Sequence, residues 1–188
     1  MGRLLDAFVA FWNVLIQPSS EQKGQKFEEL IQDTVFTKEH YDLIHLTQDG
    51  ATNSFRYVKS SEYPDMKFQD KSNGKKFWVE AKYRTKWYGT FPDQYIGFMK
   101  EYQLARYKEV DKTDPVFIAI GTGNKAWEPN QVYLIPVSRI EMAERIYKKF
   151  LLPFEIDNAF RESYRNESFV LPSKVIILNQ LYIKYTYL

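Results

Sequence analysis

The chain of 188 residues contains no cysteine and only two histidines. The lack of cysteine excludes disulfide bonds and thiolate metal sites, and it is compatible with any compartment. His40 and His45 do not have the spacing of zinc ligands, so we expect both to be structural. The sequence has no Walker motif, and the glycine-bearing segment 121–125 is too short for a phosphate-binding fingerprint. These absences exclude zinc-thiolate chemistry and P-loop chemistry.

Long hydrophobic runs are also missing. The apolar stretch 4–16 is interrupted by Asp6 and Asn13 and is too short to span a membrane. Only Arg3 precedes it as a basic residue and no small-residue cleavage site follows, so we expect a cytoplasmic protein without a signal peptide and without a membrane partner. The stretch predicts a helix that is buried either on its own domain or against a second copy in a homodimer.

Nothing in the sequence divides the chain, because it has no internal repeat, no low-complexity tract and no linker. We expect one α/β domain, with an N-terminal helix in residues 1–18, a motif-bearing core in 19–121, and further strands and a helix in 122–188. Helices are predicted at residues 20–36, 93–110 and 138–150. Strands are predicted at residues 41–48 and 55–60, in both arms of a hairpin at 63–84, and at 115–121, 131–137, 175–178 and 181–187.

A β-hairpin at residues 63–84, YPDMKFQDKSNGKKFWVEAKYR, stands out. The Asn-Gly pair at 73–74 predicts a two-residue turn, because both residue types tolerate positive φ. In the second arm the side chains alternate between two faces. Glu80, Lys82 and Arg84 share one of these faces.

Counting outward from a two-residue turn puts Asp65 opposite Lys82, and it puts Lys67 opposite Glu80. Cross-strand partners share a sheet face, so these four charged side chains are expected to cluster. Asp and Glu supply the hard oxygen ligands that suit Mg²⁺, the cation that phosphodiester cleavage commonly uses. A neighbouring ammonium keeps carboxylates ionised and can serve the attacking water or the transition state.

The order Pro64-Asp65 and then Glu80-Ala81-Lys82 on the next strand resembles the motif of the PD-(D/E)xK nucleases, the restriction-endonuclease-like superfamily. The resemblance implies that Asp65 and Glu80 hold Mg²⁺, for which Mn²⁺ substitutes, and that Lys82 is catalytic.

Two helices carry weaker resemblances to the same superfamily. KGQKFE, residues 23–28, is similar to the N-terminal helix motif of these nucleases and of archaeal Holliday-junction resolvases, which implies Glu28 as a further metal ligand. Gln103 and Tyr107 resemble the QxxxY motif of the exonuclease branch, and their i+4 spacing puts them on one helix face. An edge glutamate on a helix, or an i+4 pair, also occurs without any functional role.

The net charge of +2 is close to neutral, so nucleic-acid binding must rely on a local basic patch. Lysines and an arginine concentrate around the hairpin. The candidates for substrate contacts are Lys67, Lys75, Lys76 and Arg84.

The resemblance implies an α/β fold, a restriction-endonuclease-like mixed sheet flanked by helices with core order αβββαβ and additions at both ends. It also implies a metal-dependent nuclease that acts on DNA. Two alternatives remain open: a nucleic-acid-binding or assembly protein with the same fold that does not cleave, and an unrelated α/β domain whose hairpin charges form ordinary surface pairs.

Overall fold

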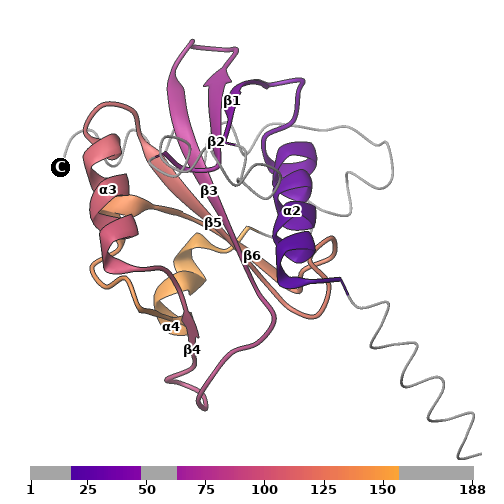
Figure 1. Ribbon diagram of the computed structural model, residues 1–188, viewed down its shortest axis with the longest axis vertical. Coiled ribbons are helices and arrows are strands. Elements are labelled where there is room, and N and C mark those ends of the chain that lie inside the picture. The colour runs from indigo at the N-terminus through magenta and orange to yellow at the C-terminus, as the bar shows by residue number, and fades with distance from the viewer. Residues whose placement is uncertain (1–17, 48–62, 157–188) are drawn as a thin grey trace, which may run out of the picture. The chain divides into compact units, whose positions relative to one another are not determined.

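The computed structural model of the chain describes residues 18–47 and 63–156. These residues form a five-stranded mixed sheet between two helices, α2 (Ser20–Leu30) and α3 (Glu101–Asp111), which lie on opposite sides of it (Figure 1). No helix within these two ranges is long and apolar enough to span a membrane. The expected helix at 4–16 and the expected strands at 55–60, 175–178 and 181–187 lie outside the described residues.

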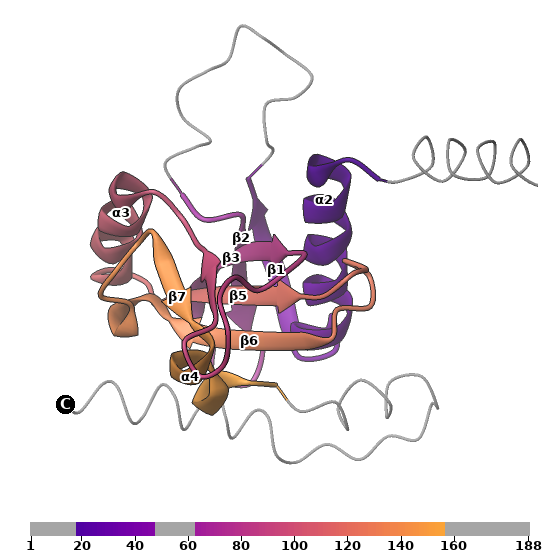
Figure 2. The same ribbon diagram turned by 90° about the horizontal axis from the view of Figure 1, so that it is seen from below.

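The sheet has the order β1 (Tyr41–Leu46), β2 (Met66–Asp70), β3 (Lys76–Arg84), β5 (Val116–Thr122) and β6 (Gln131–Pro136). β3 and β5 are parallel, whereas the other neighbours are antiparallel. A parallel pair needs a crossover connection, and α3 lies within it (Figure 2). The element order αβββαβ and this mixed sheet are the restriction-endonuclease-like fold that the sequence predicts, and that prediction is confirmed.

The helix predicted at residues 20–36 is present. Ser19 and Gln22 form the expected capping box: the Ser19 hydroxyl accepts the Gln22 backbone N–H at 3.2 Å, and the Gln22 amide oxygen accepts the Ser19 N–H at 2.8 Å. α2 continues as a π-helical turn, η1 (Ile31–Val35). Phe27 and Ile31 are fully buried, so this side of the helix covers the sheet.

Two of the predicted helices are partly wrong. Residues 95–97 form a strand, β4 (Tyr95–Gly97), that pairs with β7 (Arg145–Tyr147), and α3 begins only after Lys100. The predicted helix 138–150 is instead η3 (Val137–Arg139), β7, α4 (Lys148–Leu151) and η4 (Leu152–Phe154). Long-range pairing overrides the local helical pattern, because Phe98 and Met99 N–H groups bond to the carbonyls of Glu144 and Ala143 at 3.0 Å.

The predicted register of the hairpin is also wrong. Lys67 pairs with Trp78, not with Glu80, because the turn has four residues in place of two. The Asp70 carboxylate holds this longer turn by accepting the N–H and hydroxyl of Ser72 at 2.8 and 2.6 Å, while the Asp70 carbonyl accepts the Gly74 N–H at 2.7 Å. Lengthening the turn by two residues leaves the faces unchanged, since side chains alternate with a period of two.

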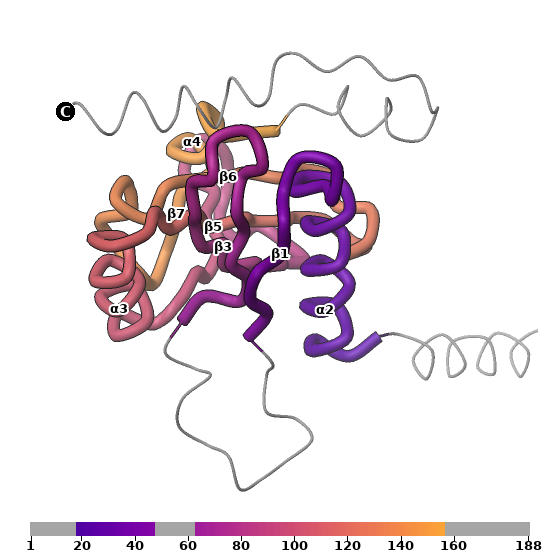
Figure 3. Tube along the Cα trace, turned by 90° about the horizontal axis from the view of Figure 1, so that it is seen from above, coloured from indigo at the N-terminus to yellow at the C-terminus, as the bar shows by residue number. Residues whose placement is uncertain are grey.

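A close contact joins α2 to the centre of the sheet. A side-chain carbon added at Gly121, on β5, would lie 2.3 Å from a ring carbon of Phe27, and that ring also lies 5.9 Å from the ring of Tyr83 on β3. Figure 3 shows α2 running along this side of the sheet. The glycine at 121 therefore sets how closely the helix that carries Glu28 approaches β3.

We predict that Gly121→Ala lowers the free energy of unfolding by about 1–3 kcal/mol, because the extra methyl group overpacks a buried contact. Urea denaturation measures this change. Gly24→Ala is the matched control: the glycine lies in α2 with no atom within 4 Å of an added Cβ, so alanine should stabilise the protein by about 0.5–1 kcal/mol. Equal stability of the Gly121→Ala variant and the parent would contradict the packing argument.

Candidate active site

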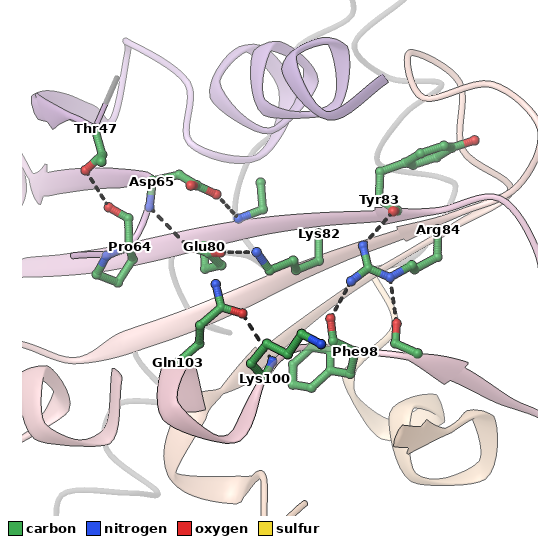
Figure 4. Close-up of polar contacts among 12 residues, drawn as sticks. Thr47, Pro64, Asp65, Glu80, Lys82, Tyr83, Arg84, Phe98, Lys100 and Gln103 are labelled. Carbon is green, nitrogen blue, oxygen red and sulfur yellow. Dashed lines mark hydrogen bonds and ion pairs between the residues drawn. The ribbon is translucent and has the colours of Figure 1, made fainter. Parts of the chain in front are cut away.

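The two predicted carboxylates, those of Asp65 and Glu80, come together at the residue that precedes β2. β2 begins at Met66, opposite Val79, whereas β3 continues to Arg84 and needs other partners there. The Asp65 side chain supplies one, because its Oδ2 accepts the Ala81 N–H at 2.8 Å. In return the Asp65 N–H donates to Oε2 of Glu80 at 3.2 Å (Figure 4). Each carboxylate is thus oriented by backbone of the neighbouring strand.

Glu80 is the most deeply buried charged group of the site. Its residue is 2% exposed, and its carboxylate forms an ion pair with the Lys82 ammonium. The phenol of Tyr107, on α3, also hydrogen-bonds to it. A buried carboxylate requires such compensation, because desolvation of an unpaired charge is costly. β3 and α3 together therefore fix Glu80.

The protonation of Asp65 is strongly perturbed. Burial and then the neighbouring Glu80 carboxylate raise the pKa of Asp65 well above its ordinary value. Lys82 and the Ala81 N–H act in the opposite direction but do not restore it. A cation placed beside this carboxylate would relieve the repulsion, so the site is one that favours bound positive charge.

Lys82 and Tyr107 both keep their protons in this environment. Burial lowers the pKa of Lys82, but the carboxylates of Glu80 and Asp65 outweigh it, so the pKa is raised overall. Burial and the charge of Glu80 raise the pKa of Tyr107. At neutral pH the site therefore presents one ammonium and one phenol to two carboxyl groups.

Glu28 approaches the site from α2. Its charge contributes to the raised pKa of Asp65, and the residue is half-buried. The next residue, Glu29, is exposed and forms an ion pair with Lys26 at 2.8 Å. The sequence predicts this difference between the two glutamates from the helical period.

The donor set is suited to a hard cation. Within residues 18–47 and 63–156, no group of three or more His, Asp or Glu side chains is drawn together closely enough for a metal ion. Mg²⁺ commonly binds through one or two carboxylates and keeps several waters or phosphate oxygens. Asp65 and Glu80, whose carboxylates accept the N–H groups of Ala81 and Asp65, fit that requirement.

Three further residues that the sequence predicts for substrate binding lie on α3 and at the hairpin turn. Gln103 accepts the Lys100 backbone N–H at 3.1 Å, so its side chain caps the start of α3 (Figure 4). Lys75 and Lys76 are exposed at the hairpin turn. Lys76 precedes Glu80 by four residues, or about 13 Å of extended strand.

The two other basic candidates are engaged elsewhere. The Arg84 guanidinium donates to the carbonyls of Gly97 at 2.6 Å, Tyr83 at 2.9 Å and Phe98, so it fastens the segment before α3 to β3 (Figure 4). Lys67 forms an ion pair with Asp114 at 2.7 Å. The sequence does not predict this ion pair, since no local pattern connects Asp114 to Lys67.

We predict that Asp65→Asn stabilises the metal-free protein at pH 7. The raised pKa means that the folded carboxyl holds a proton that the unfolded chain loses above 3.8, so the parent loses stability as pH rises from there. Asparagine removes this cost and still accepts the Ala81 N–H. Denaturation in EDTA at pH 7 and near pH 3.5 measures the difference, which should shrink towards zero at the lower pH.

The exposed Asp33→Asn variant is the control and should change the free energy of unfolding by less than about 0.5 kcal/mol. An Asp65→Asn variant less stable than the parent at pH 7 would contradict the electrostatic account.

No protein-family model matches the chain, and none of the curated proteins matches it. Among solved structures, the chain is similar to Hjc of Archaeoglobus fulgidus, a Holliday junction resolvase from an archaeal hyperthermophile. The identity is 13%, the match covers 72% of this chain and 97% of that chain, and the TM-score is 0.49. The fold is assigned independently of this similarity, from the order and pairing of the strands: the chain has the restriction-endonuclease-like mixed sheet.

Proposed function

We propose that this chain is a metal-dependent nuclease that hydrolyses phosphodiester bonds of DNA at Asp65, Glu80 and Lys82. The observation that carries the proposal is that both carboxylates are held by neighbouring backbone beside the Lys82 ammonium: that of Asp65 accepts the Ala81 N–H, and that of Glu80 accepts the Asp65 N–H. Surface ion pairs do not need a glutamate that is 2% exposed, nor an aspartate whose pKa burial raises. This burial argues against the alternative of ordinary surface pairs.

Asp65 and Glu80 would hold Mg²⁺, and Glu28, whose charge acts on Asp65, would assist from farther away through water. When bound, the cation would offset phosphate charge and promote formation of the attacking hydroxide. Lys82, which stays protonated, would orient the water or stabilise the charge that develops on the phosphate. Tyr107 would hold Glu80 in position through its phenol, and Gln103 would line the same side of β3.

A second candidate is a nucleic-acid-binding protein of the same fold that does not cleave. The pairing of Glu80 with Lys82 favours it, because this ion pair already neutralises one proposed ligand. The two candidates differ in one measurable property, since only the nuclease converts labelled DNA to shorter products when Mg²⁺ is added.

We predict that Asp65→Asn and Glu80→Gln each reduce Mg²⁺-dependent cleavage by at least about 100-fold, because each removes a charge needed to hold the cation and stabilise the transition state. Cleavage of end-labelled DNA measures this, with circular dichroism to establish folding. Asp33→Asn serves as the control and should retain full activity. Cleavage that persists in a folded Asp65→Asn, Glu80→Gln double variant would refute the proposed site.

We predict that the Glu28→Gln and Glu29→Gln variants differ in their affinity for Mn²⁺. Glu28→Gln should weaken Mn²⁺ binding by about 10- to 100-fold, the range for groups that support a metal ligand, because its charge acts on Asp65. Glu29→Gln, one residue further on the exposed side, should have no effect. Titration calorimetry with Mn²⁺ in the absence of DNA provides the measurement. Equal affinities for the two variants would remove Glu28 from the site.

A further inference from the structure

A surface rich in aromatic and basic side chains lies outside the candidate active site. It is built on the segment between β3 and α3 and on β7, which pairs with β4 in that segment. We define the aromatic–basic surface by the side chains of Lys86, Tyr88, Phe91, Tyr95, Arg145 and Lys148. Lys148 begins α4, which directly follows β7, and Figure 1 shows α4 next to β4.

The rings of this surface are presented by an ordered hairpin. Tyr88 and Tyr95 exchange two backbone hydrogen bonds, at 2.8 and 2.9 Å, and their rings stack with centroids 5.8 Å apart. Phe91, between them in the hairpin, is 79% exposed, and Tyr88 is 48% exposed. Exposed aromatic groups that are held together in this way mark a binding surface more often than scattered ones do.

The cations of this surface lie over rings and away from carboxylates. Lys86 is 5.2 Å from the Tyr88 ring centroid, Arg145 is 5.0 Å from that of Tyr95, and Lys148 is 5.4 Å from that of Trp87. None of the three forms a salt bridge with a described residue. Their positive charge is therefore left for an anionic partner.

A nearby carboxylate does not cancel this charge. Asp93, in the same hairpin, forms an ion pair with Lys149 at 2.9 Å. The surface as a whole thus combines net positive charge with exposed rings. This is the combination that single-stranded nucleic acids select, because their bases stack on aromatic faces while their phosphates contact cations.

The position of the surface relates it to the candidate active site. The segment 85–100 joins the strand that carries Glu80 and Lys82 to the helix that carries Tyr107, and Arg84 fastens its end through the carbonyls of Gly97 and Phe98. Lys86 follows Lys82 by four residues, or about 13 Å of extended chain.

We propose that the aromatic–basic surface binds unpaired nucleotides of a DNA strand. Bases stack on Tyr88 and Phe91, and phosphates contact Lys86, Arg145 and Lys148. If the chain is the nuclease proposed above, its substrate is DNA with a single-stranded segment next to the cleaved bond. A fully paired duplex keeps its base faces stacked and gains nothing from these rings.

The test compares the full chain and a Tyr88→Ala, Phe91→Ala double variant for binding to single-stranded and duplex oligonucleotides. Fluorescence anisotropy in EDTA avoids cleavage. The double variant should bind the single strand at least about 30-fold more weakly and the duplex unchanged, since each of the two stacked bases contributes about 1–3 kcal/mol. Tyr102→Ala is the control, because Tyr102 is 62% exposed with Arg106 over its ring on α3.

Salt dependence separates the rings from the cations. A Lys86→Ala, Lys148→Ala variant should lower the log-log salt slope for the single strand by about 1.4, whereas the ring variant should leave the slope unchanged. Unchanged single-strand affinity in the ring variant, equal losses on duplex, or an equal loss in Tyr102→Ala would each overturn the proposal. These measurements contain no metal, so loss of the nuclease assignment would show only in the cleavage assay.

Discussion

Two backbone N–H groups, those of Asp65 and Ala81, hold the two carboxylates of the candidate active site in place. Each donates to a carboxylate on the adjoining strand, so the ladder between β2 and β3 is completed by side chains where β2 begins. Main-chain geometry therefore positions Asp65 and Glu80, and β3 must be central and buried for the two to meet. The parallel pairing with β5 and the packing of Phe27 against Gly121 secure that central place.

This arrangement also determines how the negative charges of the two buried carboxyl groups are compensated. Glu80 can be buried because Lys82 and Tyr107 both contact it, and these two groups come from different elements, β3 and α3. Asp65 has weaker compensation, which is why its pKa rises. Asp65 is thus the acid with the least compensation, and the charge of Glu28 also acts on it. A bound cation would first stabilise the ionised form of this carboxyl group.

The sequence correctly predicts which side chains share a face of the hairpin, but it does not predict which residues pair across it. A turn of four residues and a turn of two both place Asp65 on the face of Glu80 and Lys82, because the two turn lengths differ by an even number. The capping of the four-residue turn by Asp70 was not foreseen. β4 and β7 were also missed, because Tyr95 pairs with Tyr147, some fifty positions later, and local periodicity carries no information about such a partner. The carbonyl partners of Arg84 escaped prediction for the same reason.

The hydrogen bond from Ala81 to Asp65 has a consequence for cation size. Because one lone pair of Oδ2 accepts this N–H, binding an ion through both carboxylate oxygens would crowd the bond to β3, whereas binding through Oδ1 would leave it intact. Monodentate carboxylates suit the compact octahedral shell of Mg²⁺, whereas the larger Ca²⁺ takes six to eight oxygens and often engages both oxygens of a carboxylate. The backbone of β3 would in this way discriminate between the two ions, without any side chain dedicated to that purpose.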